Sequence, residues 1–311
     1  MATRRSFIKN TALAGGAIFT SNTLFAGINS PDDIELLTIL HTNDVHSRLE
    51  PFPMDGSKNQ GLGGVAPRAE LINKIRSQEK HVLLLDAGDI FQGTPFFNLY
   101  KGEPEIKAMS AMGYDAGTMG NHDFDAGLDD FAAQLRHATF PIIISNYDFS
   151  DTVMKDKYIP YKIFKKGRLK IGITGVGVEL RGLVPDNLYG NTKYLDPIES
   201  ANKIAYKLKK EDKCDMVICL SHLGFKNSNN KVSDEVFAPQ SDNIDLIIGG
   251  HSHTFFDVPL VYKNKSGNDV IVNQVGWAGI VLGRLDFQFS KTTGKDLIKS
   301  HTVVISEKTR E

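Results

Sequence analysis

The sequence predicts an α/β domain, and two observations carry this prediction. Short apolar runs of strand length alternate with longer segments in which apolar residues recur every three or four positions. Five of the apolar runs also end in aspartate, asparagine or histidine, and function in open α/β sheets gathers beyond the carboxyl ends of strands. The chain has 311 residues, of which 41% are hydrophobic and 23% charged, a balance that suits a globular fold.

The strands are expected where apolar runs are bounded by turn residues or polar clusters. The five runs that end in polar clusters are "IELLTIL" before "HTNDVH", "HVLLLDAGD", the weaker "YDAGTMGNHD", "DMVICLSHLG" and "NIDLIIGGHSH". Further strands are expected at "PIII", "LKIGITGVG", "NDVIVNQVG", "GIVLGRLDFQF" and "SHTVVISE".

Helices are expected between these strands. In "GGVAPRAELINKIRSQ", Ala66, Ala69, Ile72 and Ile75 recur at a spacing of three residues and so share one helical face. The other expected helices are "EPEIKAMSAMG", "GLDDFAAQLRHA" and "IESANKIAYKLKKE". Because no internal repeat or linker interrupts the alternation, we expect one domain over residues 31–311.

The first 26 residues have the pattern of a bacterial export leader. Arg4 and Arg5 precede a weakly apolar stretch, as in signals of the twin-arginine type. This stretch is too short and too polar for a typical membrane span, and cleavage is expected after Ala26. Leu24 stands where a small residue is expected before the cleavage site. The alternative is therefore that the leader is not cleaved and stays as a membrane anchor. We expect residues 1–26 to direct the protein to the periplasm or beyond.

Charge and cysteine content exclude several classes of function. The chain has 36 basic and 37 acidic residues, whereas a general binder of nucleic-acid polymers would usually be more basic. Its two cysteines, Cys214 and Cys219, form neither a disulfide framework nor a cysteine-rich metal motif, and we expect buried free thiols.

The side chains that follow the strands are those of a metal site. A single histidine there would more often belong to the surface or the core, but five of the nine histidines lie just beyond such runs. These five are His46, His122, His222, His251 and His253, and they are accompanied by Asp44, Asp89 and Asn121.

Imidazole, carboxylate and amide ligands without thiolate suit Zn, Mn, Fe or Co. Without His122, seven candidate ligands remain: Asp44, His46, Asp89, Asn121, His222, His251 and His253. Seven ligands are too many for one tetrahedral ion, but they fit two divalent metals if Asp89, in the middle of the set, bridges them. Two neighbouring metals form a clamp for displacement at phosphorus, because they hold a hydroxide nucleophile and the phosphoryl oxygens together. The glycines at 88, 120, 249 and 250 would let the backbone pass close to the ions.

The ordered blocks "DVH", "GD", "GNHD", "SH" and "GHSH" resemble the calcineurin-like metallophosphoesterase signature. The longer stretches "LTILHTNDVH", "LLLDAGDIFQGTP", "MGNHDFDAG" and "IIGGHSH" are similar to the catalytic domain of the periplasmic 5′-nucleotidase family, and the resemblance runs from about residue 34 to about residue 290. It implies a four-layer α/β/β/α sandwich of two mixed sheets flanked by helices.

The resemblance also implies roles for individual residues. Asp44, His46, Asp89 and His253 would hold one metal, and Asp89, Asn121, His222 and His251 the other. The family often has Gln or Asn at position 253, so histidine there puts the preferred metal in doubt. Asn121 and His122 would also contact the substrate.

His122 would act as an acid or transition-state stabiliser while its ring is oriented by a carboxylate. Asp123 and Asp125 both compete for that orienting role. The family pattern "GNHEFD" favours Asp125 and leaves Asp123 peripheral.

Four further residues have weaker expectations. Arg68 resembles a recurrent family position that would orient a ligand carboxylate or the phosphate. A role on the helix surface is an equal alternative for it. We expect His41 to pack or to support the ligands from behind, Asp86 to bond the backbone, and Trp277 to pack, with a place at the pocket mouth as its alternative.

The expected substrate is a small phosphate ester, in particular a nucleotide or a 2′,3′-cyclic nucleotide. The family commonly has a second, substrate-selecting domain that this sequence does not contain, so a separately encoded domain of that type is an expected partner. Two alternatives remain: a sulfur-ester hydrolase like the related thiosulfohydrolases, and a non-catalytic subunit that binds metal or nucleotide.

Overall fold

The computed structural model describes residues 34–227 and 231–306. All of these belong to one compact unit, residues 34–311. The expected export leader, residues 1–26, therefore lies outside the described residues. Within the described part of the chain, no helix has the length and apolar character needed to cross a bilayer.

The first sheet has five strands in the order β13-β12-β1-β2-β3. Strands β1, β2 and β3 are parallel to one another, whereas β12 is antiparallel to β1 and to β13. The bounds are β1 Ile34–Thr42, β2 Val82–Asp86, β3 Ala116–Gly117, β12 Val281–Ser290 and β13 Gly294–Val304.

The second sheet has six strands in the order β10-β11-β9-β8-β6-β5. Its four inner strands are parallel and its two edge strands antiparallel to their neighbours. The bounds are β5 Tyr161–Lys166, β6 Leu169–Gly177, β8 Met216–His222, β9 Leu246–Gly249, β10 Leu260–Lys263 and β11 Asp269–Asn273. A small ribbon pairs β4 (Tyr147–Asp148) with β7 (Lys193–Tyr194).

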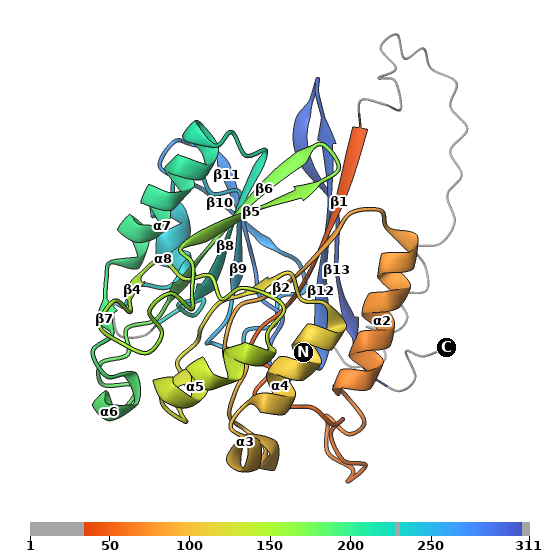
Figure 1. The fold of residues 1–311 in the computed structure, drawn as a ribbon. Coiled ribbons are helices and arrows are strands. Elements are labelled where there is room, and N and C mark those ends of the chain that lie inside the picture. The colour runs from red at the N-terminus through yellow and green to blue at the C-terminus, as the bar shows by residue number, and fades with distance from the viewer. Residues whose placement is uncertain (1–33, 228–230, 307–311) are drawn as a thin grey trace. The chain divides into compact units, whose positions relative to one another are not determined.

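The helices cover the outer faces of the two sheets (Figure 1). One apolar cluster fills the space between the sheets and includes Ile39 and Leu85 from the first and Ile173 and Ile218 from the second. The helix bounds are α2 Val65–Gln78, α3 Pro95–Tyr100, α4 Glu103–Met112, α5 Leu128–Gln134, α6 Asp186–Tyr189, α7 Pro197–Tyr206 and α8 Asp234–Gln240. Three short helical segments complete the set: η2 His122–Phe124, η3 Leu135–His137 and η4 Lys207–Glu211.

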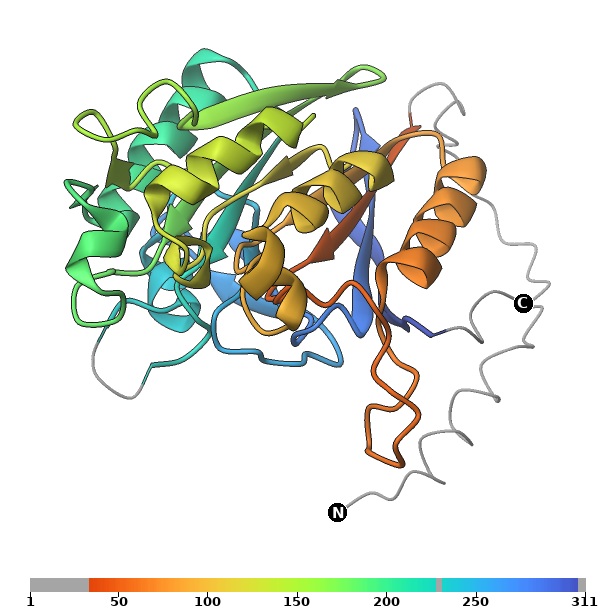
Figure 2. The same ribbon diagram turned by 60° about the horizontal axis from the view of Figure 1, so that its bottom comes forward.

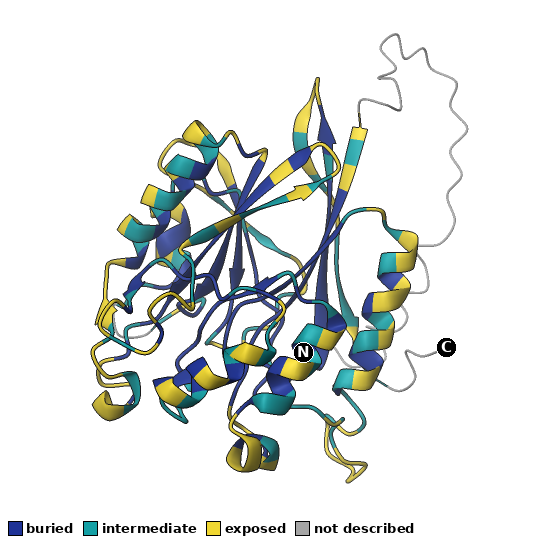
Figure 3. Cartoon of the chain, in the orientation of Figure 1, coloured by how far each residue is buried: buried dark blue, intermediate teal, exposed yellow. Residues whose placement is uncertain are grey.

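Two further clusters attach the helices. Helices α2, α4 and α5 pack on the first sheet through residues such as Ile72, Ile106 and Phe131, while α7 and α8 pack on the second through Ala201 and Phe237. The inner faces of these helices are accordingly buried and their outer faces exposed (Figure 3). The expected α/β/β/α sandwich is confirmed.

Local chemistry explains where several helices begin and end. Asp196 caps α7 by accepting a hydrogen bond from the amide of Glu199 at 2.8 Å, and Pro197 opens the helix with the backbone angle that it needs. Gly113 ends α4 with a φ of +70°, a conformation that costs glycine little. The long connection between β1 and α2 projects away from the sheets (Figure 2).

The structure differs from the expected elements at several points. The run "PIII" is not a strand, because Ile142 and Ile143 form only isolated bridges. Strand β10 and helix α8 were missed, since β10 is four residues long and α8 contains Pro239. Both cysteines are buried free thiols, as expected.

Candidate metal centre

The predicted ligands lie at one edge of the two sheets, where parallel strands end. Each ligand follows directly from the carboxyl end of a strand or completes it. Asp44 and His46 follow β1, Asp89 follows β2, Asn121 follows β3, His222 is the last residue of β8, and His251 and His253 follow β9.

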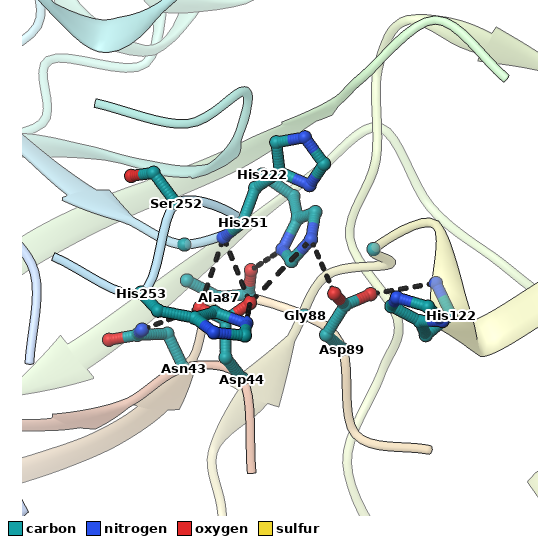
Figure 4. A network of polar contacts seen from close by, with 12 residues as sticks. Asn43, Asp44, Ala87, Gly88, Asp89, His122, His222, His251, Ser252 and His253 are labelled. Carbon is teal, nitrogen blue, oxygen red and sulfur yellow. Dashed lines mark hydrogen bonds and ion pairs between the residues drawn. The ribbon is translucent and has the colours of Figure 1, made fainter. Parts of the chain in front are cut away.

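Six of these side chains form two groups. Asp44, His46 and His253 make up the first group, and Asp89, His222 and His251 the second. Within each group the potential ligand atoms lie within 4.8 Å of one another. Figure 4 shows Asp44 and Asp89 between the imidazole rings, with dashed lines from His222 to both carboxylates.

Asp89 lies between the two groups. Its Oδ2 is 3.1 Å from Nε2 of His222 and 3.8 Å from Nε2 of His46. Asp44 lies nearer the first group, with its Oδ1 3.4 Å from Nε2 of His253. Asp89 therefore lies within 4 Å of a histidine from each group.

Several features show that these residues fit metal ions. The side chain of Asn121 is buried and its Oδ1 has no hydrogen-bond partner. A Cβ on Gly120 would lie less than 3.0 Å from both Oδ1 of Asp89 and Nε2 of His222, so only glycine leaves this space open. An unsatisfied amide oxygen beside nitrogen and carboxylate donors is the environment of a divalent cation.

Two histidines have their tautomer fixed by backbone carbonyls. Nδ1 of His222 donates to the carbonyl of Ala87 at 2.7 Å, and Nδ1 of His46 donates to that of Phe91 at 3.2 Å. In a neutral ring, Nε2 then carries the lone pair and faces the other ligands. This arrangement is typical of metal-binding histidines.

The charges of the two groups are strongly coupled. Burial alone would lower the pKa of His222, but Asp89 and Asp44 outweigh it and raise the pKa to about 10. Burial and the charge of His222 lower the pKa of His251 to about 4. The carboxylates thus stabilise a positive charge beside them, and a divalent ion held by these groups would supply such a charge.

His122 stands beside the second group with its own carboxylate. Its Nδ1 lies 2.8 Å from Oδ2 of Asp125, and its backbone amide donates to Oδ1 of Asp89 at 2.8 Å. The hydrogen bond to Asp125 raises the pKa of His122 against the effect of burial. The His122 side chain is 38% exposed, so it can reach a molecule that enters from solvent.

The expectation that Asp123 is peripheral is wrong. Its side chain is fully buried, and its two oxygens accept hydrogen bonds from the amides of Asp89, Ile90, Phe91 and Gly120 at 2.8–3.1 Å. Burial and the charge of Asp89 raise the pKa of Asp123 to about 7, although these donors oppose the shift. Asp123 therefore shapes the loop that carries Asp89.

Sequence reasoning missed two amide side chains that hold the ligand loops. Asn43 donates to Oδ2 of Asp44 at 2.6 Å and to the carbonyl of Gly276 at 2.6 Å. Gln274 donates to the carbonyl of Gly250 at 2.6 Å and accepts from Ser252 at 3.1 Å. The only sequence signal was their position next to the end of a strand, which many residues share.

Of the two roles left open for Arg68, the structure excludes the one on the helix surface. It is 2% exposed and lines a small internal cavity with Asp86, Glu105 and Tyr114. This burial argues against direct contact with substrate and also excludes a helix-surface role. Arg68 lies among the same buried polar groups as Asp86. The Asp86 carboxylate accepts a hydrogen bond from the hydroxyl of Thr42 at 2.6 Å and, as expected, one from the backbone amide of Gly88 at 2.9 Å.

His41 packs behind the ligands, as expected. It is fully buried, and its Nε2 lies 2.8 Å from the side-chain nitrogen of Asn273. Burial lowers its pKa to about 3, so the ring is neutral and its unprotonated Nε2 accepts this hydrogen bond.

Comparison with known proteins gives one matching family. The calcineurin-like phosphoesterase family matches residues 37–255, a range that contains every predicted metal ligand.

Several similar proteins are 5′-nucleotidases. The chain is 36% identical over 273 residues to snake venom 5′-nucleotidase of Gloydius brevicauda, covering 81% of this chain and 45% of the relative. It is also 36% identical over 276 residues to 5′-nucleotidase of Bos taurus, covering 82% and 47%. The crystal structure of a 5′-nucleotidase precursor from Thermus thermophilus matches with a TM-score of 0.78 at 33% identity, covering 88% of this chain and 55% of that one. The chain thus spans about half the length of these relatives.

Proposed function

This chain belongs to the calcineurin-like phosphoesterase family, and on that premise we propose that it is a metal-dependent hydrolase of phosphate esters that acts on nucleotides. The observation that carries this proposal is the position of Asp89. It lies between two groups of metal-type ligands and also accepts a hydrogen bond from the backbone of the His122 loop. The nucleotide preference is supported by the 5′-nucleotidases among its relatives.

Two divalent ions are the proposed cofactors, and their charge would stabilise phosphoryl oxygens and activate water at neutral pH. Asp44, His46 and His253 would hold one ion, and His222, His251 and Asn121 the other, with Asp89 between them. Zn, Mn, Fe and Co all suit this donor set.

The protein's own acid is the His122–Asp125 pair. Asp125 accepts a hydrogen bond from Nδ1–H of His122. This bond turns Nε2 away from the carboxylate and fixes the plane of the ring. In our proposal, the ring takes up a second proton at Nε2, and the Asp125 carboxylate stabilises the resulting imidazolium, whose pKa it raises. Nε2 then donates this proton to a phosphoryl oxygen or to the leaving oxygen, while Asp125 keeps the ring in this orientation and does not itself contact substrate.

The test is a substrate panel on the purified, metal-loaded protein. We expect phosphate release from AMP or another nucleoside monophosphate, and turnover of an aryl phosphate, with at least one of Zn²⁺, Mn²⁺, Fe²⁺ or Co²⁺. A 2′,3′-cyclic nucleotide in the panel separates monoesterase from diesterase activity. No turnover of any phosphate ester by protein that binds two ions would exclude the proposed activity.

We further propose two features that lie beyond the metal centre. Residues 1–26 would direct export, which the Arg4–Arg5 pattern supports, and a fractionation experiment with Arg4→Lys/Arg5→Lys protein tests it. A separately encoded substrate-selecting domain would act as partner, and it should lower KM for nucleotides when it is added to the same panel. Unchanged localisation or unchanged KM would overturn the respective proposal.

A further inference from the structure

The histidines of the two ligand groups differ in how they are oriented. His46 and His222 each donate Nδ1–H to a backbone carbonyl, so hydrogen bonds fix the direction of their Nε2 atoms. Partners of this kind usually contribute 10–100-fold to metal affinity. His46 belongs to the Asp44 group and His222 to the Asp89 group, so each group has at least one histidine held in this way.

His253 lacks this support. Its side chain is 41% exposed, and its polar contacts involve Nε2, which lies 3.0 Å from Nε2 of His46 and 3.4 Å from Oδ1 of Asp44. Among the described residues, no hydrogen bond fixes its Nδ1. An exposed imidazole without such a bond at Nδ1 is less restricted in its rotation and would bind a metal at a greater cost in entropy.

An aromatic contact takes the place of the missing hydrogen bond. The ring of Trp277 lies nearly parallel to that of His253, with an angle of 11° and a centroid distance of 5.9 Å, the geometry of an offset stack. In this orientation the Nε2 of His253 faces Asp44 and His46. The stack therefore restricts the rotation that the exposed ring would otherwise have.

Trp277 is itself held on both sides. The edge of Phe52 packs against it at a centroid distance of 5.8 Å, and the guanidinium of Arg48 lies 4.1 Å from the centre of the Phe52 ring. The two neighbours of Trp277 in the sequence are also held by backbone hydrogen bonds. The amide of Gly276 donates to the carbonyl of Thr254 at 2.9 Å, and the amide of Ala278 donates to the carbonyl of Asp44 at 2.7 Å. The tryptophan is thus fixed relative to both Asp44 and the His253 loop.

We propose that Trp277 is a positioning residue for His253 and sets the metal affinity of the Asp44–His46–His253 group. It touches neither substrate nor reacting atoms in this role. The proposal concerns metal binding and does not depend on the proposed phosphoesterase activity.

Calorimetric titration with Co²⁺ tests the proposal directly. In Trp277→Leu protein we expect one of the two binding steps to weaken roughly 10–100-fold, while the other stays within about threefold of wild type. Trp277→Phe keeps an aromatic face and should restore the affinity of the weakened step. Two wild-type steps in Trp277→Leu protein, or equal weakening of both, would overturn the proposal.

A double-mutant cycle separates positioning from a general structural role. His253→Ala removes the ring on which Trp277 acts, so adding Trp277→Leu to His253→Ala should cause no further loss of affinity. If the two losses add, Trp277 acts through something other than His253 and the proposal is wrong.

A third measurement does not require a tryptophan variant. Trp277 is the sole tryptophan of the chain, so the intrinsic emission of the metal-free protein reports on its surroundings. His253→Ala should change the intensity or maximum of this emission, whereas the control His137→Ala should not. Identical emission from wild-type and His253→Ala protein would show that the stack is absent in solution and would overturn the proposal.

Discussion

At the scale of single residues, the polar side chains of the loop after β3 point in different directions and have different partners. The buried Oδ1 of Asn121 is free to bind a metal, His122 extends toward solvent, and Asp125 orients the His122 ring. Asp123 points the opposite way and binds the backbone amides around Asp89. Two carboxylates that lie two residues apart therefore bind different partners, Asp125 the His122 ring and Asp123 the backbone.

Replacing His122 with Asn should slow turnover by roughly 10²–10⁴-fold, because a positioned proton donor is lost. Metal content should stay at the wild-type level, since His122 belongs to neither ligand group. Steady-state rates together with elemental analysis check both parts, and His137→Asn serves as the control. A loss of bound metal from the His122 variant would make this residue a ligand instead.

Replacing Asp123 with Asn should destabilise the protein and weaken metal binding. The amide nitrogen of Asn cannot accept hydrogen bonds, so two buried backbone amides lose their partner at about 1–3 kcal/mol each. Chemical denaturation and metal titration measure the two effects.

Asp125→Asn is the matched comparison for this prediction. It should slow turnover while leaving the free energy of unfolding within about 1 kcal/mol of wild type, because the Asp125 side chain is partly exposed and its partner among the described residues is His122. Equal stability of the Asp123 and Asp125 variants would contradict the structural role assigned to Asp123.

At the scale of elements, the strand-to-loop turns bring the backbone unusually close to the ligands. The Gly88 and Gly120 turns meet so tightly that a Cβ on either residue would lie within 3.0 Å of the other's segment and of His222. Five non-glycine ligands, in contrast, adopt the left-handed backbone conformation that side chains disfavour: Asp44, His46, Asp89, His251 and His253.

Gly120→Ala tests this close approach. The added methyl would displace Asp89 and His222, so we expect a loss of metal affinity of about tenfold or more and a destabilisation of roughly 1–3 kcal/mol. Gly117→Ala, three residues earlier, is the control, because its Cβ would meet neighbours only at ordinary distances of 3.7–3.9 Å. Metal titration of both variants measures the difference. Equal affinities would show that the close approach of Gly120 to Asp89 and His222 is not needed for metal binding.

At the scale of the whole molecule, strands of both sheets place their carboxyl ends at one centre. Buried carboxylates behind this centre make the free energy of unfolding depend on pH. Asp234, at the start of α8, is fully buried and accepts a hydrogen bond from Ser221, while its Oδ2 has no partner. Burial raises its pKa to about 7. The folded protein therefore keeps a proton there that the unfolded chain releases near pH 4.

This proton gives stability a definite pH dependence. The contribution of protonated Asp234 is complete below about pH 4 and disappears as the pH rises to about 7, because unfolding releases the proton in that window. Relative to wild type, Asp234→Asn should gain on the order of 3 kcal/mol between about pH 4.5 and pH 8.

Urea denaturation of metal-free protein at the two pH values measures the difference. Asp86 and Asp123, whose pKa values are also raised to about 7, are present in both proteins and cancel. A stability difference between variant and wild type that does not change with pH would show that Asp234 ionises normally.

The sequence by itself determined the α/β class, most of the central strands and the set of candidate ligands. It could do so because strand periodicity is local and because imidazole and carboxylate side chains reveal their chemistry wherever they stand. It failed for short or interrupted elements such as β10 and α8, whose local pattern is too brief to distinguish from a loop.

Only the tertiary structure decided how the centre is held together. The hydrogen bonds from the Asp89 loop to Asp123, the burial of Arg68 and the stack of Trp277 on His253 all depend on which segments meet in space. The left-handed backbone of the ligands is stabilised in the same way, by bonds such as Asp44 amide to Gly88 carbonyl and His46 amide to Asp89 carbonyl. Conformations that cost about 1–3 kcal/mol each leave no mark in the local sequence, because distant segments supply the bonds that stabilise them.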